Sequence, residues 1–159
     1  MPAAPAGRSP GPNRNFPRSH RLKRRAVIRT LFRRGGAGTV RRKVGDILVV
    51  ARLVPRPQLP EGAPVQLGVA AGRGLRGVRR NQTRRRLREA FREYALPELR
   101  TQLHRIPDGL VIAVMLIDAR KDAAEIDVPA AGGALSAQIA PLVDQLLRLG
   151  LPTLQTDTP

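Results

Sequence analysis

The sequence contains no cysteine and no tryptophan, and aromatic residues make up only 3% of its 159 residues. The absence of cysteine excludes a disulfide framework, a thiolate zinc site and a thiol nucleophile. The longest apolar run, at residues 110–117, is too short for a membrane span, which takes about 20 residues. No apolar segment follows the N-terminal arginines, so we expect no secretory signal. These absences predict a cytoplasmic protein whose core is built from Leu, Val, Ile and Ala.

Positive charge is abundant and unevenly placed. Lys and Arg number 29 against 12 Asp and Glu, which gives a formal net charge of +17. Residues 1–105 hold 26 of the basic and 5 of the acidic residues, whereas residues 106–159 hold 3 and 7. A charge of this size destabilises a compact fold by self-repulsion, and a polyanionic partner relieves the repulsion and releases counterions. The charge therefore predicts a nucleic acid as partner, and neither a membrane nor a small-molecule substrate.

The length suits one domain, which we place at residues 20–150. Residues 1–19 combine five prolines with Gly, Ala and Arg, a composition that predicts a disordered basic arm. Residues 151–159 are expected to form a flexible C-terminal tail.

Hydrophobic periodicity predicts three helices. The first is expected at residues 21–34, with Ser19 as its N-cap and Gly35-Gly36 as its end. The second runs from about Arg80 to Leu103, with a kink or break at Pro97. After a polar connection at residues 123–133, the last helix begins at either Leu135 or Pro141 and ends at Gly150.

Short β-branched and aliphatic runs predict the strands. A proline-rich loop separates two of them at residues 55–64. Together with the helices they predict an α+β fold, a small two-layer sandwich with its helices on one face of a sheet of about four strands. The expected strands are at residues 40–41, 47–53, 65–70 and 110–117.

The second predicted helix separates its residue types by face. Its apolar face joins the expected core, which consists of Leu87, Phe91, Tyr94, Leu110, Ile112, Val114, Leu142 and Leu146. On the adjacent flank, arginines four positions apart repel one another by a few tenths of a kcal/mol. A phosphate backbone would convert that repulsion into charge-assisted hydrogen bonds. We also expect Asn81 to cap the helix start, where free N–H groups favour an anion. The predicted nucleic-acid contacts are Arg80, Asn81, Arg84, Arg85 and Arg88.

No catalytic set or metal site is recognisable. The only histidines, His20 and His104, stand among arginines and are expected to be ordinary surface residues. The glycine pairs at 35–36 and around Arg73 are expected to form turns rather than phosphate-binding loops. The acidic residues near the last helix lack a recognisable metal-ligand spacing; they are Asp118, Asp122, Glu125 and Asp127.

Three stretches resemble the bacterial ribonuclease P protein family. Arg80-Asn81-Gln82, Arg84-Arg85 and Leu87-Arg88-Glu89-Ala90-Phe91 are similar to the family's Arg-Asn-Arg helix. Arg21-Leu22-Lys23-Arg24, followed by Leu31-Phe32-Arg33-Arg34-Gly35, is similar to its opening helix. Leu67-Gly68-Val69-Ala70 is similar to the strand that leads toward the motif helix.

The sequence also departs from the family pattern. Gln82 stands where the family has arginine, and the stretch before it, residues 71–77, is one residue shorter than usual. Ile28 and Val50 replace aromatic residues that the family commonly places in the cleft for the single-stranded leader.

The resemblance implies a protein subunit of ribonuclease P, the endoribonuclease that hydrolyses precursor tRNA at the end of its 5′ leader. In that family the chemistry belongs to the RNA subunit and its Mg²⁺, with one protein per RNA and no cofactor on the protein. It also implies a left-handed β-α-β crossover, an exception to the usual handedness. The resemblance assigns the arginine flank to the catalytic RNA, and the leader contacts to Lys23, Arg29, Phe32 and Arg33.

Two other classes fit the charge pattern. One is a structural RNA-binding protein of the ribosome or its assembly, without an enzymatic role. The other is a DNA-binding protein that uses the basic helix in the major groove. Composition alone does not separate them from a ribonuclease P subunit.

Overall fold

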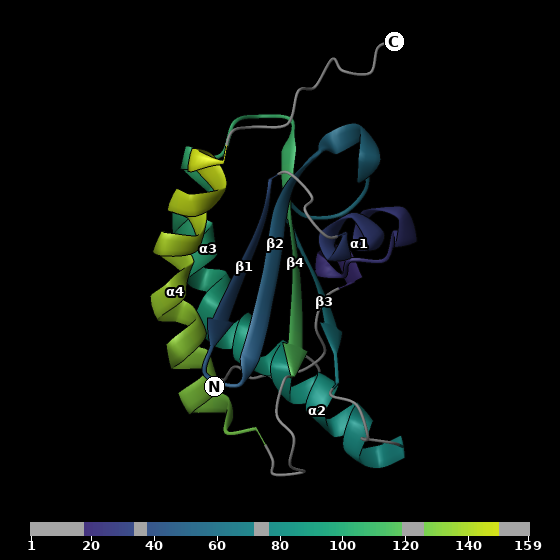
Figure 1. The fold of residues 1–159 in the computed structure, drawn as a ribbon, viewed down its shortest axis with the longest axis vertical. Helices are drawn as coiled ribbons and strands as arrows, with labels where there is room; N and C mark the ends of the chain where they lie inside the picture. Colours follow the sequence, from purple (N-terminus) through teal and green to yellow (C-terminus); the bar gives the residue numbers. More distant parts are fainter. Residues whose placement is uncertain (1–17, 34–37, 72–76, 119–125, 150–159) are drawn as a thin grey trace, which may run out of the picture.

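The computed structural model describes residues 18–33, 38–71, 77–118 and 126–149, and these residues form a four-stranded sheet with helices against it (Figure 1). The strand order is β1-β2-β4-β3. This confirms the α+β class with a four-stranded sheet. The strands are β1 (Thr39–Val44), β2 (Ile47–Pro55), β3 (Val65–Ala70) and β4 (Leu110–Asp118), and the α-helices are α1 (Arg25–Phe32), α2 (Gly77–Ala90), α3 (Leu96–Gln102) and α4 (Val128–Arg148).

The sheet is mixed. β1 and β2 form an antiparallel hairpin whose two-residue turn contains Gly45 at a φ of 60°, the conformation that such turns require. β2 is also antiparallel to β4, whereas β3 and β4 are parallel. Because α2 and α3 connect β3 to β4, the predicted β-α-β unit is present. Its left-handedness stays a prediction.

Both faces of the sheet are covered, at least in part. Along β4, Leu110, Ile112, Val114 and Leu116 belong to the core under α2, α3 and α4. The alternate residues Val111, Ala113 and Met115 belong to a second core with Val27 and Leu31 of α1. The expectation of helices on one face is therefore right for α2–α4 and wrong for α1. Burial on both faces explains why β4 is a continuous apolar run.

The segment before α1 differs from the prediction. Ser19 lies in a 3₁₀ turn (Arg18–His20) and does not cap α1, which begins only at Arg25. The backbone N–H of Leu22 donates to the carbonyl oxygen of Leu67 at 2.9 Å, and Arg21 forms a bridge with the same residue. This pairing with the edge of β3 is incompatible with a helical turn at residues 21–22.

The long basic helix is divided, as expected. A π-helical turn (Phe91–Ala95) separates α2 from α3, and the N–H of Leu96 donates to the carbonyl oxygen of Phe91, five residues earlier. Pro97 has no N–H to donate, and its ring would collide with the carbonyl four residues earlier in a regular α-helix. Of the predicted core residues, Tyr94 is only half-buried and the others are buried.

Helix α4 begins at Val128, within a segment expected to be a connection. Asp127 caps it, because its Oδ1 accepts the backbone N–H of Ala130 at 3.2 Å. Pro129 occupies the first turn, where its missing N–H costs nothing. Pro141, a candidate for the helix start, instead lies inside the helix. The last helix was therefore predicted too short.

Two neighbouring glycines of α4 give a matched test of its packing. A Cβ at Gly132 would overlap the ring of Tyr94, whereas a Cβ at Gly133 would meet nothing within 4 Å. Gly132→Ala should destabilise the fold by about 1–3 kcal/mol through overpacking. Gly133→Ala should stabilise it by about 0.5–1 kcal/mol, since alanine is the better helix former. Urea unfolding of both variants measures the difference, and equal effects would contradict the close contact of α4 with Tyr94.

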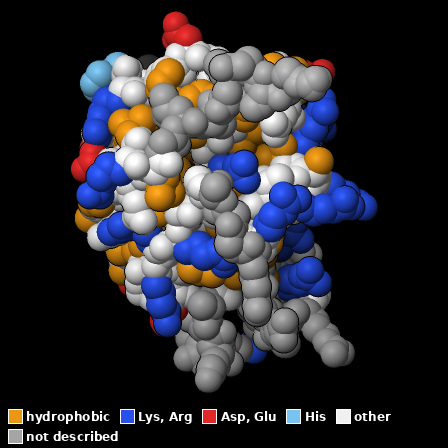
Figure 2. Space-filling model, turned by 45° about the horizontal axis from the view of Figure 1, so that its top comes forward, with side chains coloured by type: hydrophobic (Ala, Val, Ile, Leu, Met, Phe, Trp, Pro, Cys, Tyr) orange, Lys and Arg blue, Asp and Glu red, His pale blue; other side chains and the backbone are white. Residues whose placement is uncertain are grey.

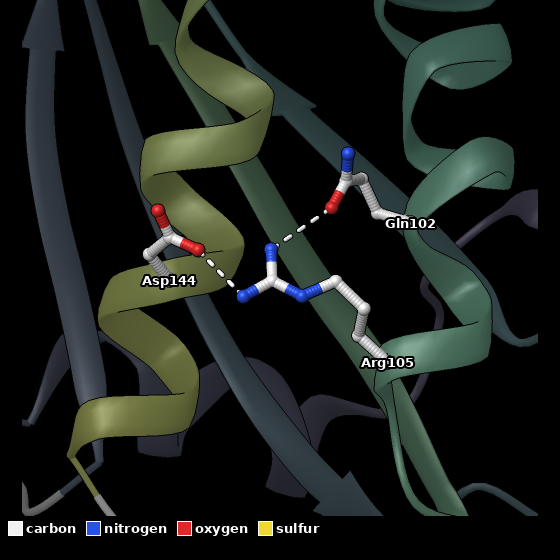
Figure 3. Close-up of polar contacts among 3 residues, drawn as sticks. All are labelled: Gln102, Arg105 and Asp144. Carbon is white, nitrogen blue, oxygen red and sulfur yellow. Dashed lines mark hydrogen bonds and ion pairs between the residues drawn. The ribbon is translucent and has the colours of Figure 1, made fainter.

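The 3₁₀ turn after α3 is tied to α4 by a surface ion pair (Figure 3). Arg105 donates to Oδ1 of Asp144 at 2.6 Å and to Oε1 of Gln102 at 3.0 Å. Both charged side chains are partly exposed, so the pair contributes only about 0–1 kcal/mol. Arg105 is thus an arginine whose charge is matched within the protein.

Candidate nucleic-acid interface

Helix α2 presents the predicted contacts on one side. Thr83, Leu87 and Ala90 are buried, which orients the helix on the sheet and α4. Arg80, Asn81, Arg84, Arg85 and Arg88 then follow one another along an adjacent stripe about 140° wide, which we call the basic flank. Arg80, Asn81 and Arg85 are exposed, and Arg84 and Arg88 are half-buried.

The expected role of Asn81 as a helix cap is wrong. Helix α2 already begins at Gly77, which has a φ of 56°. Asn81 is therefore in the second turn, where its exposed side chain is not at the N-cap position. Its amide remains available to a partner from the middle of the basic flank.

The flank carries positive charge that the described part of the chain does not neutralise. Ion pairs are seen for Arg92 with Glu93 and for Arg105 with Asp144, but no described carboxylate pairs with Arg84 or Arg88. The Nε of Arg84 is buried without a hydrogen-bond partner. An unsatisfied buried donor of this kind costs about 1–3 kcal/mol.

The positive charge of Arg88 is also unfavourable in the free protein. Burial lowers the pKa of Arg88 from its ordinary value, and the positive charges of Arg21 and Arg84 lower it further. Desolvation and like charges both disfavour the charged form of a basic group. Arg21, Arg84 and Arg88 are therefore near enough to repel one another, and a phosphate placed among them would reduce that repulsion.

Arg21 is the member of this cluster that sequence reasoning missed. It precedes Arg84 by more than sixty residues, and only its pairing with Leu67 of β3 brings it to α2. The motif that contains Arg21 was noticed, but no local pattern indicates this pairing.

A second candidate surface lies on the α1 side of the sheet. Phe32 is 40% exposed, unusual for a large apolar side chain. The partly buried Ile28, Leu48 and Ile117 pack against the apolar core that contains Val27 and Leu31 of α1. Arg29 and Arg33 are exposed at the C-terminal half of α1. We call this apolar area and its basic rim the α1 surface.

Strand β1 adds two cations that were not predicted. Arg41 and Lys43 are exposed, and the register pairs Arg41 with Val50 and Lys43 with Leu48. Directly paired residues share a face, so both side chains lie on the α1 side of the sheet. The strand expected at residues 40–41 contained Arg41 but was too short to include Lys43. A prediction of the full six-residue strand would have placed both side chains on the same face. Lys23, by contrast, lies before α1, in a pocket with Arg18, Arg21 and Arg24.

The remaining candidate residues are a histidine and two acidic residues outside both surfaces. His104 is exposed and contacts the carbonyl of Thr101 at 3.0 Å, Asp118 is buried and Asp127 caps α4. Within the described ranges, no three His, Cys, Asp or Glu residues are grouped closely enough to hold a metal ion. Other predictions lie outside the described residues: those on the arm at 1–17, on Gly35-Gly36, on residues 72–76, on Asp122 and Glu125, and on the tail from residue 150.

The exposed charge is strongly unbalanced. On the face that Figure 2 shows, Lys and Arg side chains cover far more of the described surface than Asp and Glu do. None of the described helices has the length and apolar content needed to cross a membrane. This surface can attract a polyanion and orient it along fixed helices and strands.

Comparison with known proteins agrees with these features. The family model described as Ribonuclease P matches residues 16–128, a range that includes the basic flank and the α1 surface. No curated protein matches the chain. Because the matched range covers well over half of the sequence, the chain belongs to the ribonuclease P family, whose enzyme is an endoribonuclease of tRNA processing.

Proposed function

We propose that the chain is the protein subunit of ribonuclease P and binds the catalytic RNA through its basic flank. One observation carries this proposal: Arg84 and Arg88 are half-buried, close to Arg21, and unpaired with any described carboxylate. Phosphate oxygens accept charge-assisted hydrogen bonds from arginine. A folded RNA can supply such oxygens to all the flank residues, including Arg80 and Arg85.

The α1 surface is proposed to bind the 5′ leader of precursor tRNA. Unpaired bases stack on aromatic side chains and on the planes of arginine, and Phe32 offers an exposed ring. Arg29 and Arg33, together with Arg41 and Lys43 of β1, can bind the phosphates on either side. Because Ile28 is not aromatic and Val50 is buried in the core under α1, arginine contributes a larger share of this binding.

In this proposal the RNA subunit and its Mg²⁺ carry out the hydrolysis. Metal ions activate water and stabilise the leaving oxygen in phosphodiester cleavage. The protein neutralises phosphate charge and positions the precursor, with one protein bound to each RNA in the cytoplasm. It contributes no catalytic residue and needs no cofactor of its own.

The absence of cysteine allows a direct test of both surfaces. Single-cysteine variants Arg85→Cys, Arg33→Cys and Arg148→Cys are each labelled with a photo-activated crosslinker. Arg85→Cys should crosslink to ribonuclease P RNA, and Arg33→Cys to the leader of precursor tRNA bound to that RNA. Arg148→Cys is the matched control, because it also removes one exposed arginine and lies at the end of α4 remote from α2 (Figure 1). Equal crosslinking at all three positions would contradict the proposed orientation.

A further inference from the structure

A basic pocket of about 310 Å³ lies between the segment that precedes α1 and the loop that follows β2. Arg18, Arg21, Lys23 and Arg24 line one side, and residues 59–62 line the other. Among the described lining residues, Glu61 is the only acid. Four cations thus face a single carboxylate, in a volume within the range of small-ligand sites, about 300–1,000 Å³.

Backbone contacts hold the two walls together. The N–H of Ala63 donates to the carbonyl oxygen of Ser19 at 2.7 Å. A Cβ at Gly62, which has a φ of 96°, would lie 2.7 Å from the same oxygen. The close approach of the chains therefore requires glycine at this position. The distance between the walls is set by the backbone and does not depend on long side chains.

Side chains fix the loop wall further. Arg56 donates to the carbonyl oxygen of Gly62 at 2.6 Å. Gln66, which is only 3% exposed, donates through Nε2 to the carbonyl oxygen of Glu61 at 2.8 Å. The proline-rich loop is thus held in one conformation. Lys23 and Arg24 are exposed in the opposite wall, and the loop itself contributes Leu59 and Pro60 as an apolar surface.

Arg21 connects the pocket with the basic flank. Arg21 lines the pocket, and its charge also lowers the pKa of Arg88 on α2. A chain of phosphates bound along Arg84 and Arg88 would reach Arg21 next. Phosphate groups are spaced regularly along RNA, so a strand on the flank can place a neighbouring phosphate in the pocket.

We propose that this pocket binds a phosphodiester group of RNA, as a second anionic subsite beside the basic flank. The inference rests on the proposed function and gives the loop at residues 55–64 a role in it. Arginine presents a planar fork that matches phosphate oxygens. Leu59 and Pro60 can contact the sugar or base of the same nucleotide.

The first test removes two charges from the pocket. Arg18→Gln with Arg24→Gln should weaken RNA binding about tenfold at 0.15 M salt and reduce the slope of log K against log salt by about 1–2, as expected when one or two phosphate contacts are lost. Arg105→Gln with Arg148→Gln is the control, since it removes the same charge away from the pocket. Ribonuclease P RNA and precursor tRNA are titrated separately, which identifies the RNA that supplies the phosphate.

A loss specific to the pocket pair, with either RNA, supports the subsite. If the wild-type protein binds ribonuclease P RNA and the pocket pair behaves like the control pair with both RNAs, the subsite is refuted and the proposed function stands. If the wild-type protein binds neither RNA, the proposed function fails as well.

A second test is expected to strengthen RNA binding instead of weakening it. Glu61 takes part in the structure through its backbone carbonyl, so Glu61→Gln leaves the loop contacts in place. Removing the only acid of the described lining should strengthen RNA binding about two- to threefold, because a like charge no longer opposes the phosphate. Asp46→Asn, in the exposed β1–β2 turn, is the matched control and should have a smaller effect. Equal effects of the two variants would refute the subsite.

Discussion

Replacing Arg84 and Arg88 together by glutamine should lower the affinity for ribonuclease P RNA about 100-fold. Each charge-assisted hydrogen bond contributes about 1.5 kcal/mol or more, and 1.4 kcal/mol corresponds to a tenfold change in affinity. The slope of log K against log salt should fall by about 2, since two phosphate contacts are lost. The measurement is a titration of the RNA at several salt concentrations.

The same double variant should not lose thermal stability. It removes a buried Nε without a partner. It also removes the charges of Arg84 and Arg88, and with them the repulsion from Arg21 and Arg84 that adds to burial in lowering the pKa of Arg88. Both changes favour the free folded protein, so Tm should stay unchanged or rise. Arg105→Gln with Arg148→Gln removes equal charge and should affect RNA affinity much less. A parallel fall of Tm and affinity in the Arg84 and Arg88 variant would indicate a structural role for the two arginines.

The variant is expected to lose RNA affinity but not stability, and the charges of the basic flank explain this difference. In the free protein, arginines held near one another repel, and the described chain provides no carboxylate for Arg84 or Arg88. Stability alone would favour smaller or neutral residues at these two positions. The proposed binding of a polyanion would explain their presence in a half-buried arrangement.

Much of the fold could be predicted because local patterns specify it. The period-3.6 spacing of Leu87 and Phe91 identified the buried face of α2. The continuous apolar run of β4 identified a strand, although helices were expected on only one face of the sheet. Pro97 marked the division between α2 and α3, because the chemistry of its ring is independent of tertiary context. Strand β3 and the position of the basic flank were predicted for the same reason.

The errors arise where distant segments meet. Ser19 has the chemistry of a helix cap, but the pairing of Leu22 with Leu67 shifts the start of α1 to Arg25. The segment that contains Gly132 has the composition of a connection, yet Gly132 is buried in helix α4, where Tyr94 packs against it. No local pattern contains these contacts.

The candidate sites also differ in whether a local pattern or a contact between distant segments determines them. The basic flank lies on one helix, so the sequence placed its residues side by side, and only the capping role of Asn81 was wrong; their contacts with RNA stay a prediction. Arg21, Arg41 and Lys43 reach their surfaces through strand pairing, so their positions depend on the fold. The basic pocket joins the segment before α1 to the proline-rich loop, and no local pattern indicates that these two segments lie together.

The second large effect concerns the cleavage reaction itself. At low Mg²⁺ concentration, the phosphates of the catalytic RNA and of precursor tRNA repel each other with little screening. The protein should offset this repulsion through the basic flank and the α1 surface. Adding it should therefore accelerate cleavage by ribonuclease P RNA at least about tenfold, equivalent to about 1.4 kcal/mol of barrier.

The most direct measurement of the central claim is this cleavage rate, with and without the purified full-length chain, at a Mg²⁺ concentration where the RNA alone is slow. We predict faster cleavage at the end of the 5′ leader, with an acceleration that Arg84→Gln with Arg88→Gln largely removes and Arg105→Gln with Arg148→Gln retains. A protein that leaves the rate unchanged, while binding ribosomal RNA as tightly as ribonuclease P RNA, would contradict the account and favour a structural role in the ribosome or its assembly.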